Sequence, residues 1–166
     1  MQNRSAAFDF DGTIADWRRG VSPDYRNPEA TMKDCYSNPS LRWIAIQLHK
    51  NGFQLHVLTG RDKRHQIVLQ AWLKFYGIEA RIHCRPNHVG LSCEQQADWK
   101  ASVLKELNPI MYVGDNRLID EAGARQAKVA FVHVDQAAAA LERVRVPQDP
   151  LQTIRTPIQE LLELLL

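Results

Sequence analysis

Two carboxylates, Asp9 and Asp11, stand at the end of the apolar residues 5–10, within the sequence AAFDFDGTIAD. Such an apolar stretch is typical of a strand buried on both faces of a parallel sheet, where an uncompensated carboxylate costs several kcal/mol. Both residues therefore fit only at the exposed carboxyl end of the strand, and their spacing directs them to one side of an extended chain. Gly12 allows the sharp turn that must follow.

Two like charges this close oppose each other's ionisation unless a divalent cation lies between or near them. A hard ion such as Mg²⁺, held by a few carboxylates and by the phosphate of a substrate, suits an all-oxygen site. We therefore expect Asp9 and Asp11 to be metal ligands and Mg²⁺ to be the cofactor.

A second apolar stretch, residues 54–59, ends in Thr59 and is followed by Gly60 and Arg61. A hydroxyl, a glycine and a guanidinium at the end of a strand can hold phosphate oxygens, and the N-terminus of a following helix adds its dipole. Taken alone, Thr59 is explained equally well as a helix cap, so its weight comes from the neighbouring features.

A third set of polar groups follows the stretch 110–114. Asp115 comes directly after it and is expected as the third acidic metal ligand. Lys100 lies on the helical stretch that leads into this strand, where it can neutralise a nucleophile or a phosphate, although a lone lysine is usually solvated. Because matching features end several strands, one catalytic site is favoured over a series of unrelated turns and caps.

The elements that must position these residues alternate between strand and helix patterns. Short runs rich in Val, Ile and Phe predict strands, and longer amphipathic runs predict helices, one of them with Ile67 on its apolar stripe. This alternation implies an α/β, Rossmann-like parallel sheet flanked by helices, with a ligand site beyond the carboxyl ends of the strands. Gly52 and Gly77 are expected to be left-handed helix caps. The expected strands are 5–10, 54–59, 80–84, 110–114 and 129–134, and the expected helices are 39–50, 62–76, 94–107 and 118–127.

The chain of 166 residues, 45% of them hydrophobic, is long enough to bury the core of one domain. We expect that domain over residues 1–145, followed over 146–166 by a linker and a helical tail, LLELLL, whose apolar end favours docking on the body over a seam with a second copy, which stays open. A net charge of +2 demands neither a nucleic-acid nor a membrane partner. Three cysteines without a CxxC pair, no secretion leader and no run of roughly 20 apolar residues favour a cytoplasmic protein without membrane association.

Taken in order, FDFDGT, LTGR, Lys100 and VGDNRLID resemble the four motifs of the haloacid dehalogenase (HAD) superfamily of phosphohydrolases, over residues 6–134. The resemblance implies that Asp9 attacks phosphorus and that Asp11 is the general acid and base. It also implies that Thr59 and Lys100 hold the transferring phosphoryl group. Within that family, an aspartate two positions after the nucleophile favours phosphate over halide chemistry.

The resemblance assigns Mg²⁺ to Asp115, with Asn116 or Asp120 as its helper, so the expected metal ligands are Asp9, Asp11 and Asp115. A carboxylate is an adequate nucleophile once a cation removes its repulsion against phosphate. Phosphoryl transfer then requires mainly in-line positioning and electrostatic stabilisation. Asp11 gives a proton to the leaving oxygen and later takes one from the attacking water.

Cap domains in this family close over small substrates and are inserted after the first or the third strand. Residues 16–38 are expected to form a short loop, and the segment of residues 85–92 is even shorter. Neither segment is therefore long enough to fold into a separate lid. We therefore expect a minimal cap domain or none. An open site suits a large substrate whose end is presented to it.

Arginines crowd the loops at the expected catalytic edge. Basic residues there can hold a polynucleotide backbone, and Trp17 can stack a terminal base, although packing within its own loop is the commoner role of such a ring. The residues expected to bind substrate are Arg18, Arg19, Arg61 and Arg85.

At closer range, the segments DCYSNPSLRWIAIQLHKNGFQLHVLTGRD, HCRP and DWK resemble the 3′-phosphatase domains of bacteriophage-type polynucleotide kinase–phosphatases. The chain departs from them at Gln96, where they have an acidic residue, and at Gly114, where they favour paired aspartates. On the strength of the resemblance, the leading hypothesis is that the chain removes 3′-phosphate from polynucleotide ends, in nucleic acid repair. No GxxxxGK[ST] motif supports a kinase activity.

Two other hypotheses stay open. The same chemistry could serve free nucleotides or another small phosphorylated metabolite. The fold could also belong to a catalytically silent binding protein, although three charges gathered at one edge cost stability unless a metal binds them.

Overall fold

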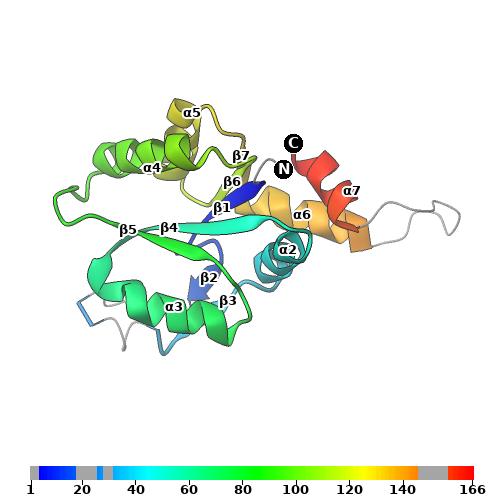
Figure 1. Ribbon diagram of the computed structural model, residues 1–166, viewed down its shortest axis with the longest axis horizontal. Helices are drawn as coiled ribbons and strands as arrows, with labels where there is room; N and C mark the ends of the chain where they lie inside the picture. Colours follow the sequence, from blue (N-terminus) through cyan, green and yellow to red (C-terminus); the bar gives the residue numbers. More distant parts are fainter. Residues whose placement is uncertain (1–3, 18–25, 28–31, 146–156) are drawn as a thin grey trace, which may run out of the picture.

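Five parallel strands form the central sheet of the computed structural model, which describes residues 4–17, 26–27, 32–145 and 157–166. The strand order is β5–β4–β1–β6–β7, so the first strand lies in the middle of the sheet. Figure 1 shows the sheet running between two groups of helices. The strands are β1 (Ser5–Asp9), β4 (Gln54–Asp62), β5 (Arg81–Arg85), β6 (Tyr112–Gly114) and β7 (Phe131–His133).

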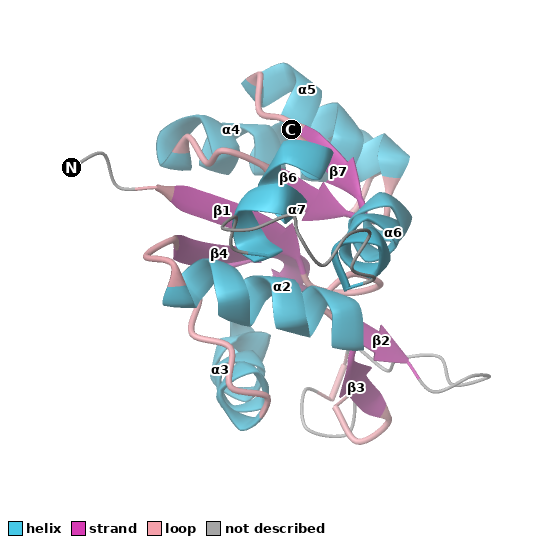
Figure 2. Ribbon diagram, turned by 90° about the vertical axis from the view of Figure 1, so that its right-hand side faces the viewer, coloured by secondary structure: helices cyan, strands magenta, loops and turns pink. Residues whose placement is uncertain are grey.

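Helices cover both faces of this sheet, as Figure 2 shows. Successive residues of β1 point to opposite faces, so Ala6 and Phe8 belong to the larger apolar layer and Ala7 to the smaller one. The larger layer includes side chains of α2, α3, α6 and α7, and the smaller one includes α4 and α5. The predicted α/β, Rossmann-like sheet flanked by helices is confirmed. The helices are α2 (Pro39–Lys50), α3 (Gln66–Phe75), α4 (Cys93–Leu107), α5 (Ala122–Ala127), α6 (Val134–Arg145) and α7 (Pro157–Leu165).

Local signals set the ends of α2 and α3. The backbone N–H groups of Ser40 and Leu41 donate to Oδ1 of Asn38 at 3.1 and 3.2 Å, which caps the start of α2. Gly52 and Gly77 follow α2 and α3 with φ angles of 82° and 73°. Both glycines are therefore the left-handed caps that were predicted.

The start of α3 differs from the prediction of a helix over 62–76. Strand β4 continues to Asp62, whose side chain accepts a hydrogen bond from the backbone of Arg64 and caps a 3₁₀ turn over Lys63–His65. The α-helix begins only after that turn. Ile67 is 82% exposed, so its predicted place on the apolar stripe is wrong.

Two helical segments of the second half also differ from prediction. The helix expected over 118–127 begins as a π-helical turn, Arg117–Glu121, before it continues as α5. Helix α6 was not predicted, although Ala137, Ala140, Leu141 and Val144 recur at helical spacing and pack on the core. Alanine is also the strongest helix former, and Ala137 and Leu141 of this helix are fully buried.

A small second sheet lies in the segment that was expected to be a loop. Strand β2 (Ala15–Trp17) pairs antiparallel with β3 (Cys35–Ser37), so the loop interpretation is wrong at these positions. Strands of three residues show too little alternation to be recognised in a sequence. Between β1 and α2, this pair is the regular structure that the described residues contain.

The C-terminal helix α7 packs on α6 and α2, with Leu161 fully buried. The expected linker at residues 146–156 lies outside the described residues. Across the ranges that the structure describes, we find no helix with the length and apolar character that crossing a membrane requires.

Two histidines meet on neighbouring strands. Nδ1 of His56 on β4 lies 3.0 Å from Nε2 of His83 on β5, and His56 is only 2% exposed. Burial and the neighbouring charges of His83 and Arg81 lower the pKa of His56 to about 4. Burial is also the main reason why the pKa of His83 is lowered. The fold therefore holds His56 in its neutral form.

This pair predicts a loss of stability in acid. The unfolded chain takes up a proton on His56 below a pH of about 6.5, whereas the folded chain resists it until about 4. The free energy of unfolding should therefore fall as the pH drops from about 6.5 to 4. Urea denaturation at several pH values should show a smaller fall for His56→Gln than for His88→Gln, which changes an exposed histidine. Equal slopes in the two variants would contradict the assignment.

Candidate active site

A cavity of about 530 Å³ opens at the carboxyl ends of β1, β4 and β6. Parallel strands end at the same edge of a sheet, which brings side chains from distant segments together there. Arg18 and Arg19, which were predicted to bind substrate, lie outside the described residues. Six other residues expected at the site line the cavity: Asp9, Asp11, Arg61, Arg85, Lys100 and Asp115.

Lys100 of α4 joins several of these groups below the cavity surface. Its side chain is 3% exposed, and its ammonium donates to Oδ1 of Asp9 at 2.5 Å and to Oδ1 of Asp120 at 2.6 Å. The third hydrogen bond goes to the hydroxyl of Tyr112 at 2.9 Å. That hydroxyl donates to Oδ1 of Asp120 at 2.8 Å. An ammonium has three donors, so all three are engaged here: one holds Asp9, the expected nucleophile, and the other two hold Asp120 and Tyr112.

Two buried carboxylates share this one ammonium, which leaves a surplus of negative charge. Burial outweighs the attraction of Lys100 and raises the pKa of Asp9 well above its usual value, and the charge of Asp120 raises it further. Burial lowers the pKa of Lys100, but the charges of Asp9 and Asp120 outweigh burial and leave it raised. A cation at this cluster would favour ionised Asp9, which is the form that can act as a nucleophile.

Three carboxylates could hold such a cation. Asp9, Asp115 and Asp120 bring one oxygen each within 4.8 Å of one another, and Asp115 is the exposed member. Burial and then the charge of Asp120 raise the pKa of Asp115 as well. Hard oxygen ligands at the edge of a rigid sheet are what Mg²⁺ binds, with water and substrate oxygens completing its shell. The donor set therefore fits the expected cofactor.

Of the two residues considered as helpers of Asp115, the structure places Asp120 in the cluster. Asn116 Oδ1 instead accepts from the backbone N–H groups of Leu118 and Ile119 at 3.0 and 3.2 Å, so Asn116 caps the π-helical turn. The turn brings Asp120 back to the sheet, where its Oδ2 accepts from the backbone N–H of Asn116 at 3.1 Å.

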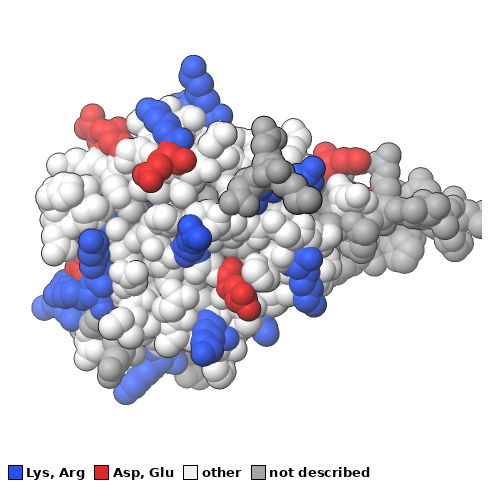
Figure 3. Space-filling model, viewed as in Figure 1, with Lys and Arg blue, Asp and Glu red and all other residues white. Residues whose placement is uncertain are grey.

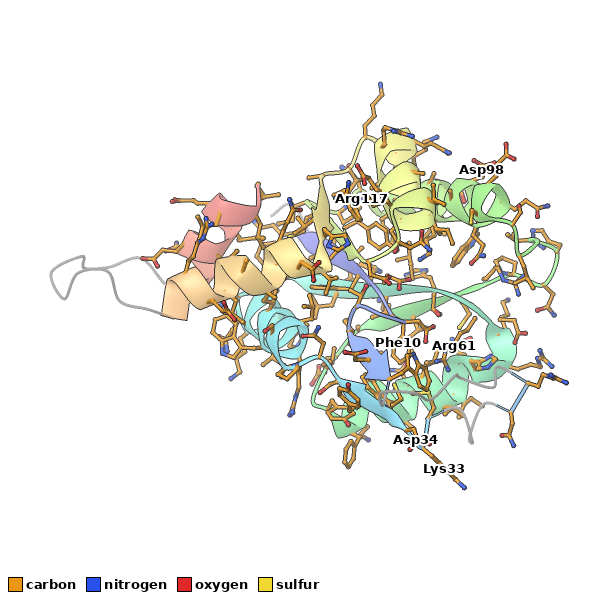
Figure 4. The ribbon with its side chains drawn as sticks, turned by 180° about the vertical axis from the view of Figure 1, so that it is seen from behind. Phe10, Lys33, Asp34, Arg61, Asp98 and Arg117 are labelled. Atoms are coloured by element: carbon orange, nitrogen blue, oxygen red, sulfur yellow. The ribbon has the colours of Figure 1, made fainter. Side chains whose placement is uncertain are left out.

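Asp11, which was expected to bind metal, pairs with Arg61. Nε and Nη2 of Arg61 donate to the two carboxylate oxygens of Asp11 at 3.0 and 2.6 Å, which is a bidentate geometry. The Arg61 side chain is 1% exposed and lies 5.2 Å from the ring centres of both Phe10 and Trp17. Figure 4 shows Phe10 and Arg61 close together. Arg61 thus fixes Asp11 at the cavity. Of the three expected metal ligands, Asp9 and Asp115 belong to the carboxylate cluster and Asp11 does not.

Thr59 and Arg85 both contact the backbone around the cavity. Thr59 is fully buried, does not line the cavity, and its Oγ1 accepts from the backbone N–H of Arg61 at 3.2 Å. Arg85 donates from Nε to the carbonyl of Gly60 at 2.9 Å and from Nη1 to the carbonyl of Val89. Arg85 therefore braces the loop after β5 while it lines the cavity.

Basic side chains gather near the start of α3, at the left edge of the molecule in Figure 3. Arg64, with 69% of its side chain exposed, donates from Nη2 to Oδ2 of Asp62 at 2.7 Å. Arg64 lines the cavity, as does Arg26. The approach to the acidic cluster is therefore flanked by cations that could attract a phosphorylated substrate.

Sequence reasoning missed Tyr112 and His65, and left Asp120 as one of two choices. Tyr112 lies in a buried strand, and a buried phenol normally needs a hydrogen-bond partner, which is the signal that could have pointed to Lys100. His65 stands alone in a polar run, and nothing in the sequence indicates that it is buried.

Two glycines make room for the acidic cluster. A Cβ atom at Gly114 would lie 2.6 Å from the Cβ of Asp120, and a Cβ atom at Gly12 would collide with the carboxylate of Asp115. Gly12 also has a φ angle of 77°, which disfavours any other residue. Both positions therefore require glycine for reasons that involve the cluster itself.

Gly12→Ala is expected to weaken Mg²⁺ binding by at least about tenfold, because the new methyl group displaces Asp115. Gly52→Ala is the matched control: Gly52 has a φ angle of 82°, but nothing lies within 4 Å of its added Cβ. Both variants should lose about 1–2 kcal/mol from backbone strain. Calorimetric titration with Mg²⁺ and urea denaturation separate the two effects, and equal Mg²⁺ affinity in both variants would contradict the prediction.

Comparison with known proteins gives matches among solved structures. A chain of the Pnkp1/Rnl/Hen1 RNA repair complex matches 80% of this chain with a TM-score of 0.66 and 17% identity. The match covers 42% of that chain, so the present chain spans less than half its length. No protein-family model and no curated protein matches the sequence.

Two further structures resemble the chain over most of their own length. A protein assigned as a phosphoglycolate phosphatase from Lactobacillus delbrueckii subsp. bulgaricus has a TM-score of 0.54 and 15% identity, with 80% of this chain and 86% of that chain covered. The HAD domain of the effector protein Lem4 from Legionella pneumophila has a TM-score of 0.51 and 14% identity, with 79% and 84% covered. The chain therefore has the HAD-type fold that its four motifs imply.

Proposed function

We propose that the chain is a Mg²⁺-dependent phosphomonoester hydrolase that works through an aspartyl-phosphate on Asp9. The buried network in which Lys100 joins Asp9 to Asp120, next to the exposed carboxylate of Asp115, carries the proposal. A fold gains no stability from two buried carboxylates that share one ammonium beside a third carboxylate, so a bound cation and a phosphorylated substrate account for the arrangement. Mg²⁺, held by these carboxylates, would supply positive charge against the phosphoryl oxygens.

The chain's own side chains divide the reaction into two steps. Asp9 forms a bond to phosphorus, the bond to the leaving oxygen breaks, and protonated Asp11 gives that oxygen its proton. Water then attacks phosphorus while Asp11 takes its proton, and the bond between Asp9 and phosphorus breaks to release inorganic phosphate. Lys100 keeps Asp9 in place in both steps, and the bidentate contact with Arg61 orients Asp11 in its ionised form, the form that takes the proton from water.

We propose further that the substrate is a 3′-phosphate at a polynucleotide end. The described residues contain no cap domain, and the exposed side chains of Arg26 and Arg64 line the cavity, which suits a phosphate backbone. The likeness to a chain of an RNA repair complex supports the same choice. The likeness to a protein assigned as a phosphoglycolate phosphatase makes a small phosphorylated metabolite the second candidate.

A phosphate-release screen tests the proposal. Oligonucleotides with a 3′-phosphate are compared with 5′-phosphorylated oligonucleotides, mononucleotides and sugar phosphates, each with Mg²⁺ and with EDTA. We expect the highest kcat/KM for the 3′-phosphorylated oligonucleotides and no turnover in EDTA. Faster turnover of mononucleotides or sugar phosphates would favour the small-molecule candidate. No turnover of any ester would favour a binding protein.

A further inference from the structure

His65 is a buried imidazole without a hydrogen-bond partner at the wall of the cavity. It belongs to the 3₁₀ turn that follows β4, it is 2% exposed, and it lines the cavity. Neither ring nitrogen has a hydrogen-bond partner in the structure. Buried polar side chains are nearly always paired, so an unpaired imidazole beside a substrate cavity indicates that a ligand supplies its partner.

The carboxylate next to His65 determines which ring nitrogen would meet that ligand. Oδ1 of Asp62 lies 3.4 Å from Nδ1 of His65, too far for a good hydrogen bond but close enough to attract its proton. Hydrogen bonds from Arg64 lower the pKa of Asp62 and keep it ionised. In the neutral imidazole a proton on Nδ1 is therefore favoured, and Nε2 is then a hydrogen-bond acceptor. The group that fits Nε2 is a donor such as a hydroxyl.

The charges around the cavity also favour a neutral partner over a second anion. Among the described residues that line the cavity, Asp side chains and Lys or Arg side chains occur in equal number, five of each. A divalent cation and the nearly dianionic phosphate of a monoester also balance each other. The lining, the cation and the scissile phosphate are then close to neutral in sum, so a group without charge suits His65, whose ring nitrogens have no hydrogen-bond partner among the described residues.

We propose that His65 is a specificity-determining residue that accepts a hydrogen bond from a hydroxyl of the sugar bearing the scissile phosphate. The inference rests on the proposed function. Both ring nitrogens are shielded from solvent, so the contact needs a small turn of the ring about χ2, a torsion with a broad minimum. In a polynucleotide with a 3′-phosphate, the neighbouring hydroxyl is the ribose 2′-OH, which is the group that distinguishes RNA from DNA. The chain should therefore prefer ribonucleotide ends.

The test compares kcat/KM for 3′-phosphorylated RNA and DNA oligonucleotides of matched sequence. We expect the wild-type chain to prefer RNA by about five- to tenfold, as the loss of one buried hydrogen bond implies. His65→Phe keeps a ring but removes the acceptor, and should bring the RNA-to-DNA ratio close to one. His65→Gln places an amide oxygen near the position of Nε2 and should keep most of the preference. Thermal unfolding shows whether each variant is folded.

Each other outcome counts against the inference. Equal rates on RNA and DNA by the wild-type chain would overturn the role of His65 and leave the phosphatase proposal standing. An RNA preference that survives in folded His65→Phe would show that the imidazole only packs. Release of phosphate from neither oligonucleotide, with release from mononucleotides or sugar phosphates, would overturn the proposed polynucleotide substrate and the inference with it.

Discussion

Asp9→Asn is expected to abolish phosphate release, with kcat at least about 10⁴-fold lower, because an amide cannot form the acyl-phosphate bond. The fold should persist. Asn has the shape of Asp, can still accept a hydrogen bond from Lys100, and removes one of the buried negative charges that share this ammonium. Steady-state phosphate assays, together with thermal unfolding of the same preparation, measure both effects.

Asp98→Asn is the matched control for Asp9→Asn. Asp98 lies on the exposed side of α4, does not line the cavity, and accepts a hydrogen bond from Gln126 at 3.0 Å. The control should therefore keep its phosphate-release rate. If Asp9→Asn releases phosphate at a rate near that of Asp98→Asn, Asp9 is not the nucleophile.

Lys100→Met is expected to have the largest effect on folding stability. The change leaves the carboxylates of Asp9 and Asp120 buried without their shared ammonium, which costs about 3–5 kcal/mol in comparable cases. Activity should fall by about 10²–10³-fold even under conditions where the variant is folded, since a charge that holds the nucleophile is gone. Urea denaturation at neutral pH gives the change in the free energy of unfolding.

Two further variants show whether the missing ammonium charge causes the loss of stability in Lys100→Met. Lys105→Met removes an exposed lysine of the same helix and should change the free energy of unfolding by less than about 1 kcal/mol. Adding Asp120→Asn to Lys100→Met should recover part of the lost stability, because one uncompensated carboxylate disappears. Similar losses in Lys100→Met and Lys105→Met would show that the network contributes little.

The sheet and the edge at which the site forms were predictable because strand periodicity and polar strand ends are local signals. Asp9 and Lys100 lie 91 positions apart, yet the element that holds each residue was predictable by itself. The two residues were then expected to lie close together because parallel strands end at the same edge of a sheet. Similarly, Gly52 and Gly77 were predictable as caps, because glycine at the end of a helix readily adopts a positive φ angle.

The partners of individual side chains were not predictable, because they depend on geometry that no local pattern encodes. The π-helical turn decides that Asp120, and not Asn116, meets Lys100. The antiparallel pair β2–β3 places the Trp17 ring next to the guanidinium of Arg61. That guanidinium in turn donates hydrogen bonds to Asp11. Sequence spacing alone placed Asp11 beside Asp9 and so suggested a shared ion.

A crystal structure of the chain with Mg²⁺ and beryllofluoride, a mimic of the phosphoryl group, shows directly whether Asp9 takes up the phosphoryl group beside a bound ion. We expect beryllium bonded to a carboxylate oxygen of Asp9, a fluoride near Lys100, and one Mg²⁺ bound by Asp9 and Asp115 with Asp120 beside it. A map in which the mimic lies away from Asp9, with no ion among the three carboxylates, would contradict this expectation.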